Sequence, residues 1–303
     1  MKLPLLVCWL FLLIPMIGQS QGQYRIAQTQ SLAGKPLNSP PVDEKVVQKA
    51  DSILQVIQSK ATLSEDDFIE IGKQLVAKAK YKEAVANYSE GLMRFPNSFK
   101  LLRYRGHRYL TLRKLDLVVR DLLKARELIK SQPDVWEVDA KGKPTDTYQH
   151  QIEYHLGVYY FLKKEYKNAV NAFELSLKYA HDANEIVGTT DWLYSSYMRN
   201  KQNKEAETLL KNFTPDAKAD KEQAYFRRIL LYKGAAQPSE ILDETKSPDQ
   251  WSIQEVTRAF GLANWYAWQG NKTKAQELYS KILNANNSWP AFAYLASEVE
   301  MMK

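Results

Sequence analysis

A spacing of small and bulky side chains recurs along this chain about every 34 residues. In residues 81–98, an alanine follows a tyrosine by three positions, an aromatic residue comes four positions later and a glycine three after that, and a proline follows. A shift of 34 residues brings Ala84 onto Val118 and Gly72 onto Gly106. Related copies follow at 150–183, 197–210 and 266–283. Self-similarity at a fixed period predicts a stacked array of repeats.

Each unit is predicted to be two helices joined by a short turn. The segment Ser64–Asp67 resembles a capping box that begins the first helix, and Pro96 stops the second. Small residues let paired helices approach closely, and bulky ones fill the remaining space. The residues expected at these helix contacts are Gly72, Ala84, Tyr88, Gly106, Gly157, Ala169, Phe173 and Ala275.

The unit has Gly at its eighth position, Tyr or Leu at the eleventh, Ala at the twentieth, an aromatic residue at the twenty-fourth and Pro at the thirty-second. It therefore resembles the tetratricopeptide repeat (TPR). The resemblance covers residues 65–289 and is broadly to secreted bacterial TPR proteins, which generally lack an assigned activity. It implies an all-α, right-handed superhelical solenoid of five to six antiparallel helix pairs. The alternative, a set of ordinary helical bundles, does not account for the recurrence.

Two irregular spacings indicate where the array departs from its period. Val118 and Ala169 are 51 residues apart, which is one repeat plus 17 and predicts an insert loop at 133–149. Because long loops are often binding elements, Trp136 in this loop is a candidate contact residue. The alternative is that Trp136 folds back into an apolar gap. Ala206 and Ala275 are 69 residues apart, which predicts a degenerate repeat at about 221–254.

The N-terminal segment has the composition of an export signal. Lys2 precedes an apolar run from Leu3 to Ile17, and residues 18–20 offer a small-x-small cleavage site. The run is short for a membrane span, which needs roughly 20 residues, so an uncleaved anchor is the alternative to a signal peptide at 1–20. Residues 21–42, rich in Gln, Ser, Pro and Gly, are predicted to be a flexible leader.

Helices are expected at both ends of the array. Asp43 can cap an N-terminal helix within 43–64, which carries valine and isoleucine on one broad face. At the other end, Pro290 precedes an apolar stripe, and residues 290–303 are predicted to be a helix that covers the last repeat.

The sequence contains no recognised catalytic, cofactor or metal motif. The four histidines are His107, His150, His155 and His181, and no HExxH, GxSxG or glycine-rich phosphate loop occurs. Cys8, the single cysteine, lies in the apolar run. The sequence therefore predicts a protein that is not an enzyme and holds no cofactor and no metal.

The resemblance to TPR proteins implies that the first helices of successive pairs line a concave groove, which in that family commonly binds an extended peptide. Residues 100–130 hold ten Lys and Arg and three acidic residues. The candidate groove residues are Lys73, Lys100, Arg103, His107 and Tyr154, whose cations could pair with ligand carboxylates. They do not reproduce the lysine–asparagine clamp of chaperone-binding members. A solvated basic face is the alternative.

We therefore expect a non-catalytic scaffold of the cell envelope, periplasmic or extracellular, that holds a protein or peptide partner in its groove, possibly an acidic one. Glycan or envelope-polymer binding through exposed aromatic side chains is the alternative, because the chain holds 18 Tyr, 10 Phe and 7 Trp. The formal charge of +7 is moderate and no nucleic-acid-binding motif is present, so nucleic acid is not an expected partner. No membrane insertion is expected after cleavage of the signal.

Overall fold

The computed structural model describes residues 26–139, 142–213 and 219–302. The predicted signal peptide at 1–20 lies outside these residues. The helices are α1 (Glu44–Gln58), α2 (Glu65–Ala77), α3 (Tyr81–Arg94), α4 (Phe99–Thr111), α5 (Leu115–Ile129), α6 (Tyr148–Leu162), α7 (Tyr166–Lys178), α8 (Ala183–Arg199), α9 (Asn203–Asn212), α10 (Gln223–Tyr232), α11 (Pro238–Ile241), the 3-10 helix η1 (Pro248–Gln250), α12 (Ile253–Trp268), α13 (Lys272–Ile282) and α14 (Phe292–Met301). Within the described ranges, none of these helices is both long and apolar enough to span a bilayer.

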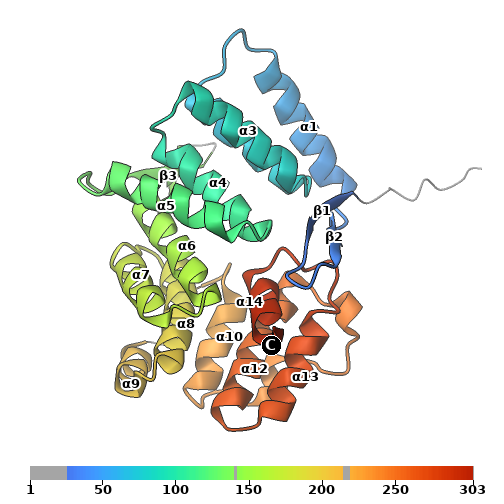
Figure 1. The fold of residues 1–303 in the computed structure, drawn as a ribbon, viewed down its shortest axis with the longest axis vertical. Helices are drawn as coiled ribbons and strands as arrows, with labels where there is room; N and C mark the ends of the chain where they lie inside the picture. The colour runs from blue at the N-terminus through green and yellow to red at the C-terminus, as the bar shows by residue number, and fades with distance from the viewer. Residues whose placement is uncertain (1–25, 140–141, 214–218, 303) are drawn as a thin grey trace, which may run out of the picture.

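The helices pack as consecutive pairs, from α2 with α3 to α12 with α13 (Figure 1). The second helix of each early pair also contacts the first helix of the next, as α3 does with α4 and α5 with α6. The degenerate unit keeps a first helix, α10, but its second helix, α11, is a single short turn. Helix α1 packs on α2, and α14 packs on α12 and α13. The protein has an all-α TPR-like solenoid fold.

Small residues lie where paired helices cross. A Cβ atom on Gly72 of α2 would lie 2.1 Å from Tyr88 of α3, and one on Gly157 of α6 would lie 2.6 Å from Phe173 of α7. Such distances are far below van der Waals contact, so only glycine fits there. Gly106 faces Leu122 in the same way. Ala84, Ala169 and Ala275 are buried at the corresponding crossings.

The expected flexible leader at 21–42 differs from the structure over the part that is described. Strands β1 (Ala27–Gln30) and β2 (Pro36–Asn38) form an antiparallel hairpin. The Thr29 hydroxyl donates to the carbonyl of Leu112 at 2.7 Å, and the buried Leu37 packs in the main core. The polar composition of this segment predicted flexibility wrongly, because the hairpin is stabilised by the helices it packs on rather than by its own apolar residues.

The two ends of the array meet, so the solenoid closes on itself (Figure 1). The indole of Trp289 donates to the carbonyl of Asn38 in β2 at 2.6 Å. Arg113, in the turn after α4, binds both carboxylate oxygens of Glu298 in α14 at 3.2 Å. These side chains are each 4% exposed. The C-terminal helix thus covers the last repeat and also contacts the second one, and the open ribbon expected from the repeats is instead a ring.

The insert at 133–149 is a second hairpin rather than an irregular loop. Strands β3 (Trp136–Val138) and β4 (Pro144–Thr147) pair antiparallel, and β4 leads directly into α6. Glu137 of β3 accepts hydrogen bonds from Tyr104 and forms an ion pair with Lys73 at 2.9 Å. The hairpin is therefore attached to the first helices of the first two repeats, beside the concave side of the array.

Candidate functional site

The ring of helices surrounds a cavity of about 660 Å³. First helices of successive pairs line it, together with β4 and the start of α14. Because these helices lie on the concave side of the solenoid, the cavity occupies the place where the sequence predicts a groove. The polar residues of its lining are Arg103, His107, Arg108, Thr111, Glu137, Thr145, Asp146, His150, Gln151, Tyr154, His155, Asp182, Asn184, Glu185, Lys221, Glu222, Tyr225, Gln254 and Thr257.

Two arginines of α4 form the basic wall of this cavity, Arg103 and Arg108. Arg103 is 6% exposed, donates to Gln151 and lies 3.7 Å from Glu137, but its Nε has no hydrogen-bond acceptor among the residues described. Arg108 forms no ion pair within the described ranges, and its guanidinium lies 5.9 Å from the ring centre of Tyr81. Burial lowers the pKa of Arg108. Within the described ranges, Glu137 therefore partly balances the charge of Arg103, whereas no carboxylate pairs with Arg108.

Two histidines lie beside the basic wall. The ring centres of His107 and His155 are 4.1 Å apart, and that of His107 is 5.3 Å from the ring centre of Phe292 in α14. Burial, with the charges of Arg108 and Arg103 added, holds the pKa of both imidazoles well below the usual range. Both rings are therefore neutral at pH 7 and add hydrogen-bonding capacity rather than charge.

The structure separates the predicted groove residues into two groups. Arg103, His107 and Tyr154 line the cavity, whereas Lys73 and Lys100 are absent from its lining. Lys73 pairs with Glu137, and Lys100 lies 3.3 Å from Glu65 and 3.1 Å from Asp66 at the start of α2. Both lysines thus bridge neighbouring elements of the protein. Arg108, which was not among the predicted groove residues, is a cation of the lining that forms no ion pair within the described ranges.

Trp136 lies on β3 and is 41% exposed, with its ring 4.6 Å from that of His181. It does not fill an apolar gap and is absent from the cavity lining. The other aromatic side chains gather in the core, where Trp192, Trp251 and Trp289 are fully buried. In the described part of the chain, Trp136 is the one aromatic residue among the exposed large apolar side chains.

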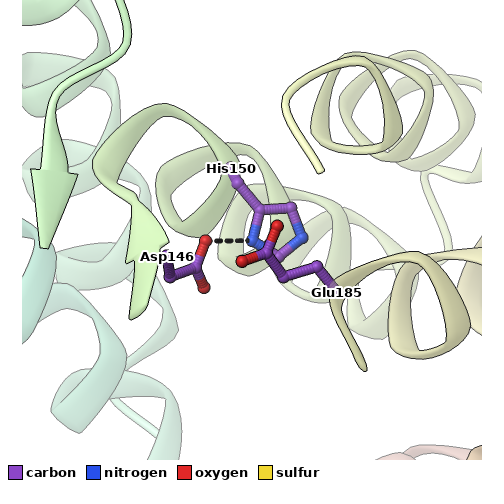
Figure 2. A group of neighbouring side chains, drawn as sticks. All are labelled: Asp146, His150 and Glu185. Atoms are coloured by element: carbon purple, nitrogen blue, oxygen red, sulfur yellow. Dashed lines mark hydrogen bonds and ion pairs between the residues drawn. The ribbon is translucent and has the colours of Figure 1, made fainter. Parts of the chain in front are cut away.

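Three potential ligand groups meet on the side of the cavity formed by β4, α6 and α8: Asp146, His150 and Glu185 (Figure 2). Their ligand atoms all lie within 4.8 Å of one another. Asp146 Oδ1 is 2.8 Å from His150 Nδ1, and Glu185 Oε2 accepts from the backbone N–H of His181 at 2.6 Å. Burial and the nearby charge of Asp146 raise the pKa of Glu185.

The cluster was not among the predicted site residues, although the sequence holds one signal for it. Asp146 and His150 are only four residues apart, on the two sides of the junction between β4 and α6, so the chain keeps them close together. The third member, Glu185, comes from the next repeat. Glu185 comes close to the other two residues only because α6 and α8 pack together with α7, and no local sequence motif predicts that packing.

Comparison with known proteins gives structural likeness only. No protein-family model matches the chain. No curated protein matches it in sequence. Among solved structures, a structure of MamA AMB-1 is 17% identical and covers 59% of this chain and 96% of that chain, with a TM-score of 0.41. YrrB, described as a TPR protein with an unusual peptide-binding site, is 13% identical and covers 78% of this chain and 93% of that one, with a TM-score of 0.42. The APC/C complex Cut9–Hcn1 is 15% identical, covers 77% of this chain and 45% of that one, and has a TM-score of 0.34.

Proposed function

We propose that this protein is a non-catalytic scaffold that binds a peptide, or a short segment of a partner protein, in its central cavity. The observation that carries the proposal is the unpaired guanidinium of Arg108, which faces a cavity lined by the first helices of the repeats. Arg108 is half-buried, and removing a cation from water without a counter-charge costs free energy unless a ligand supplies that charge.

The cavity suits a short polar segment. Its volume of about 660 Å³ is within the range of about 300–1,000 Å³ that ligand sites usually occupy. Arg103 and Arg108 both line the cavity, and so do the neutral imidazoles of His107 and His155. An Asp or Glu side chain of the ligand would balance the basic wall, which supports an acidic partner segment.

We also propose that the protein is exported, on the strength of the signal-like composition of residues 1–20. A glycan ligand lacks comparable support. Binding of sugar rings through exposed aromatics needs several coplanar rings on the surface. Among the described residues, Trp136 is the one aromatic residue in the set of exposed large apolar side chains.

A peptide library displayed on phage tests the proposal, with selected peptides then synthesised and titrated against three forms of the protein. Arg108→Gln removes the unpaired cation, whereas Lys100→Gln removes a cation of the same helix that faces away from the cavity. We expect acidic peptides to be selected, and Arg108→Gln to weaken them by about tenfold or more, as loss of a charged hydrogen bond does. Lys100→Gln should bind as the unaltered protein does.

Two results would overturn the assignment. One is selection of peptides without acidic residues. The other is an equal effect of the two substitutions, which would indicate non-specific attraction to a basic protein rather than binding in the cavity.

A further inference from the structure

The geometry points to a metal site in the wall of the cavity: we propose that Asp146, His150 and Glu185 bind a divalent ion of the zinc class. One imidazole and two carboxylates are a donor set that suits Zn²⁺ and its first-row neighbours. The three side chains come from β4, the first turn of α6 and the first turn of α8, and their ligand atoms lie within 4.8 Å of one another (Figure 2). The proposal does not depend on the peptide ligand.

The imidazole of His150 is held with one nitrogen toward the carboxylates. Its Nδ1 faces Asp146 at 2.8 Å, and its Nε2 lies 3.0 Å from the hydroxyl of Thr189. Thr189 is fully buried in α8. Metal-binding histidines usually hydrogen-bond a second protein group through the other nitrogen, which fixes the ring. With Nε2–H donating to Thr189, the lone pair of Nδ1 is on the side of Asp146, and a ligand oxygen of Glu185 lies within 4.8 Å.

Among the described residues, neither carboxylate forms an ion pair with a Lys or Arg, although the charge of Arg103 acts on Asp146 at longer range. Asp146 and Glu185 are 8% and 9% exposed, yet neither pairs with a Lys or Arg within the described ranges. Glu185 uses Oε2 to accept from a backbone N–H, whereas Oε1 has no protein donor in the same part of the chain. Two carboxylates buried this close together repel each other, and a divalent cation between them would remove that repulsion.

The site also has room for the remaining ligands of a metal. All three residues belong to the lining of the central cavity, so the positions that the protein does not fill face that space. Water, or a donor atom of a molecule in the cavity, can occupy them. Open positions of this kind distinguish such a site from a closed structural zinc site.

Zn²⁺ titration of the full chain, carrying Cys8→Ser in every form so that no thiol competes, tests the proposal by calorimetry. We expect one ion per chain. Glu185→Gln preserves the shape of the side chain and should weaken binding by more than about 100-fold, because it removes a ligand. Thr189→Val should weaken it by about 10- to 100-fold, the usual effect of losing a group that orients a metal ligand. Glu222→Gln changes a cavity carboxylate outside the cluster and should leave Zn²⁺ affinity nearly unchanged.

A second measurement does not depend on the variants folding. The ¹⁵N resonance of His150 Nδ1 in the unaltered chain should shift on Zn²⁺ addition, with Nε2 remaining protonated. Absence of saturable binding would overturn the proposal, as would an equal loss in Glu185→Gln and Glu222→Gln or a His150 resonance that Zn²⁺ leaves unmoved. In those cases His150 is simply a hydrogen-bond partner of Asp146.

Discussion

In the first three repeats a glycine of one helix faces a large side chain of the next, whereas between the fourth and fifth repeats a buried carboxylate faces a buried arginine. Gly72 against Tyr88 and Gly157 against Phe173 represent the first arrangement. Asp191 of α8 and Arg228 of α10, 2.8 Å apart and both fully buried, represent the second. The comparison shows that a TPR-like array can continue through a degenerate unit if a polar contact replaces the missing apolar one.

The polar contact still depends on a small residue. A Cβ atom on Gly261 of α12 would lie 2.3 Å from Nε of Arg228, so a glycine again makes room for the larger partner. The guanidinium also lies 5.2 to 5.8 Å from the ring centres of Tyr225, Phe260 and Trp192. Arg228 thereby connects α8, α10 and α12, although the second helix of the degenerate repeat is only a short turn.

The largest expected effect comes from breaking the Asp191–Arg228 pair. Asp191→Asn leaves a buried guanidinium that cannot lose its proton, and should lower the free energy of unfolding by about 3–5 kcal/mol. Arg228→Met should cost less, because burial already raises the pKa of Asp191 to about 7 against the attraction of Arg228, so the remaining carboxyl can become neutral. Urea denaturation of both variants measures the difference. Equal losses, or a loss below about 1 kcal/mol in Asp191→Asn, would show that the pair does not connect these repeats.

Glycine-to-alanine substitutions should change the free energy of unfolding in opposite directions at a helix crossing and at a helical position outside one. Gly157→Ala should lower the free energy of unfolding by about 1–3 kcal/mol, because the new methyl group collides with Phe173. Gly188→Ala is the matched control in α8, where a Cβ atom would meet nothing within 4 Å. This control should raise stability by about 0.5–1 kcal/mol, the usual gain of alanine over glycine inside a helix. A stability gain in both variants would contradict the close helix approach in the early repeats.

The third expected effect is a pH dependence that arises in the degenerate unit. Burial, with repulsion from Asp182, raises the pKa of Glu222 to about 7, above the value of 4.5 that is usual for a glutamate side chain. The folded protein therefore binds this proton more tightly than the unfolded chain does, and stability should fall as pH rises from about 4.5 to about 7. Glu222→Gln should reduce that slope, whereas Glu207→Gln on the exposed part of α9 should not. Denaturation midpoints measured at pH 5 and pH 7.5 distinguish the two, and identical slopes in all forms would remove Glu222 as a source.

Much of the fold follows from local pattern, and much of the site does not. The spacing of Gly72, Ala84 and Tyr88 predicts helix pairs because each contact joins residues within one unit. Arg103, His107 and Tyr154 were placed on the concave side by the resemblance to TPR proteins, which also placed Lys73 and Lys100 there although neither lines the cavity. Which cations form ion pairs, by contrast, depends on the acidic residues that reach them from other elements, as Glu137 reaches Lys73 and Asp66 reaches Lys100.

What the sequence by itself determined is the repeating unit, since an interval of 34 residues and small side chains at the crossings suffice to specify paired helices. Only the tertiary structure decided that the array closes into a ring around a cavity. Trp289 and Asn38 are 251 residues apart, as are Lys35 and Asn286, and the meeting of Asp146, His150 and Glu185 likewise crosses repeat boundaries. Each repeat adds a small rotation, and the summed curvature brings such residues together. That sum cannot be predicted from the sequence of a single repeat.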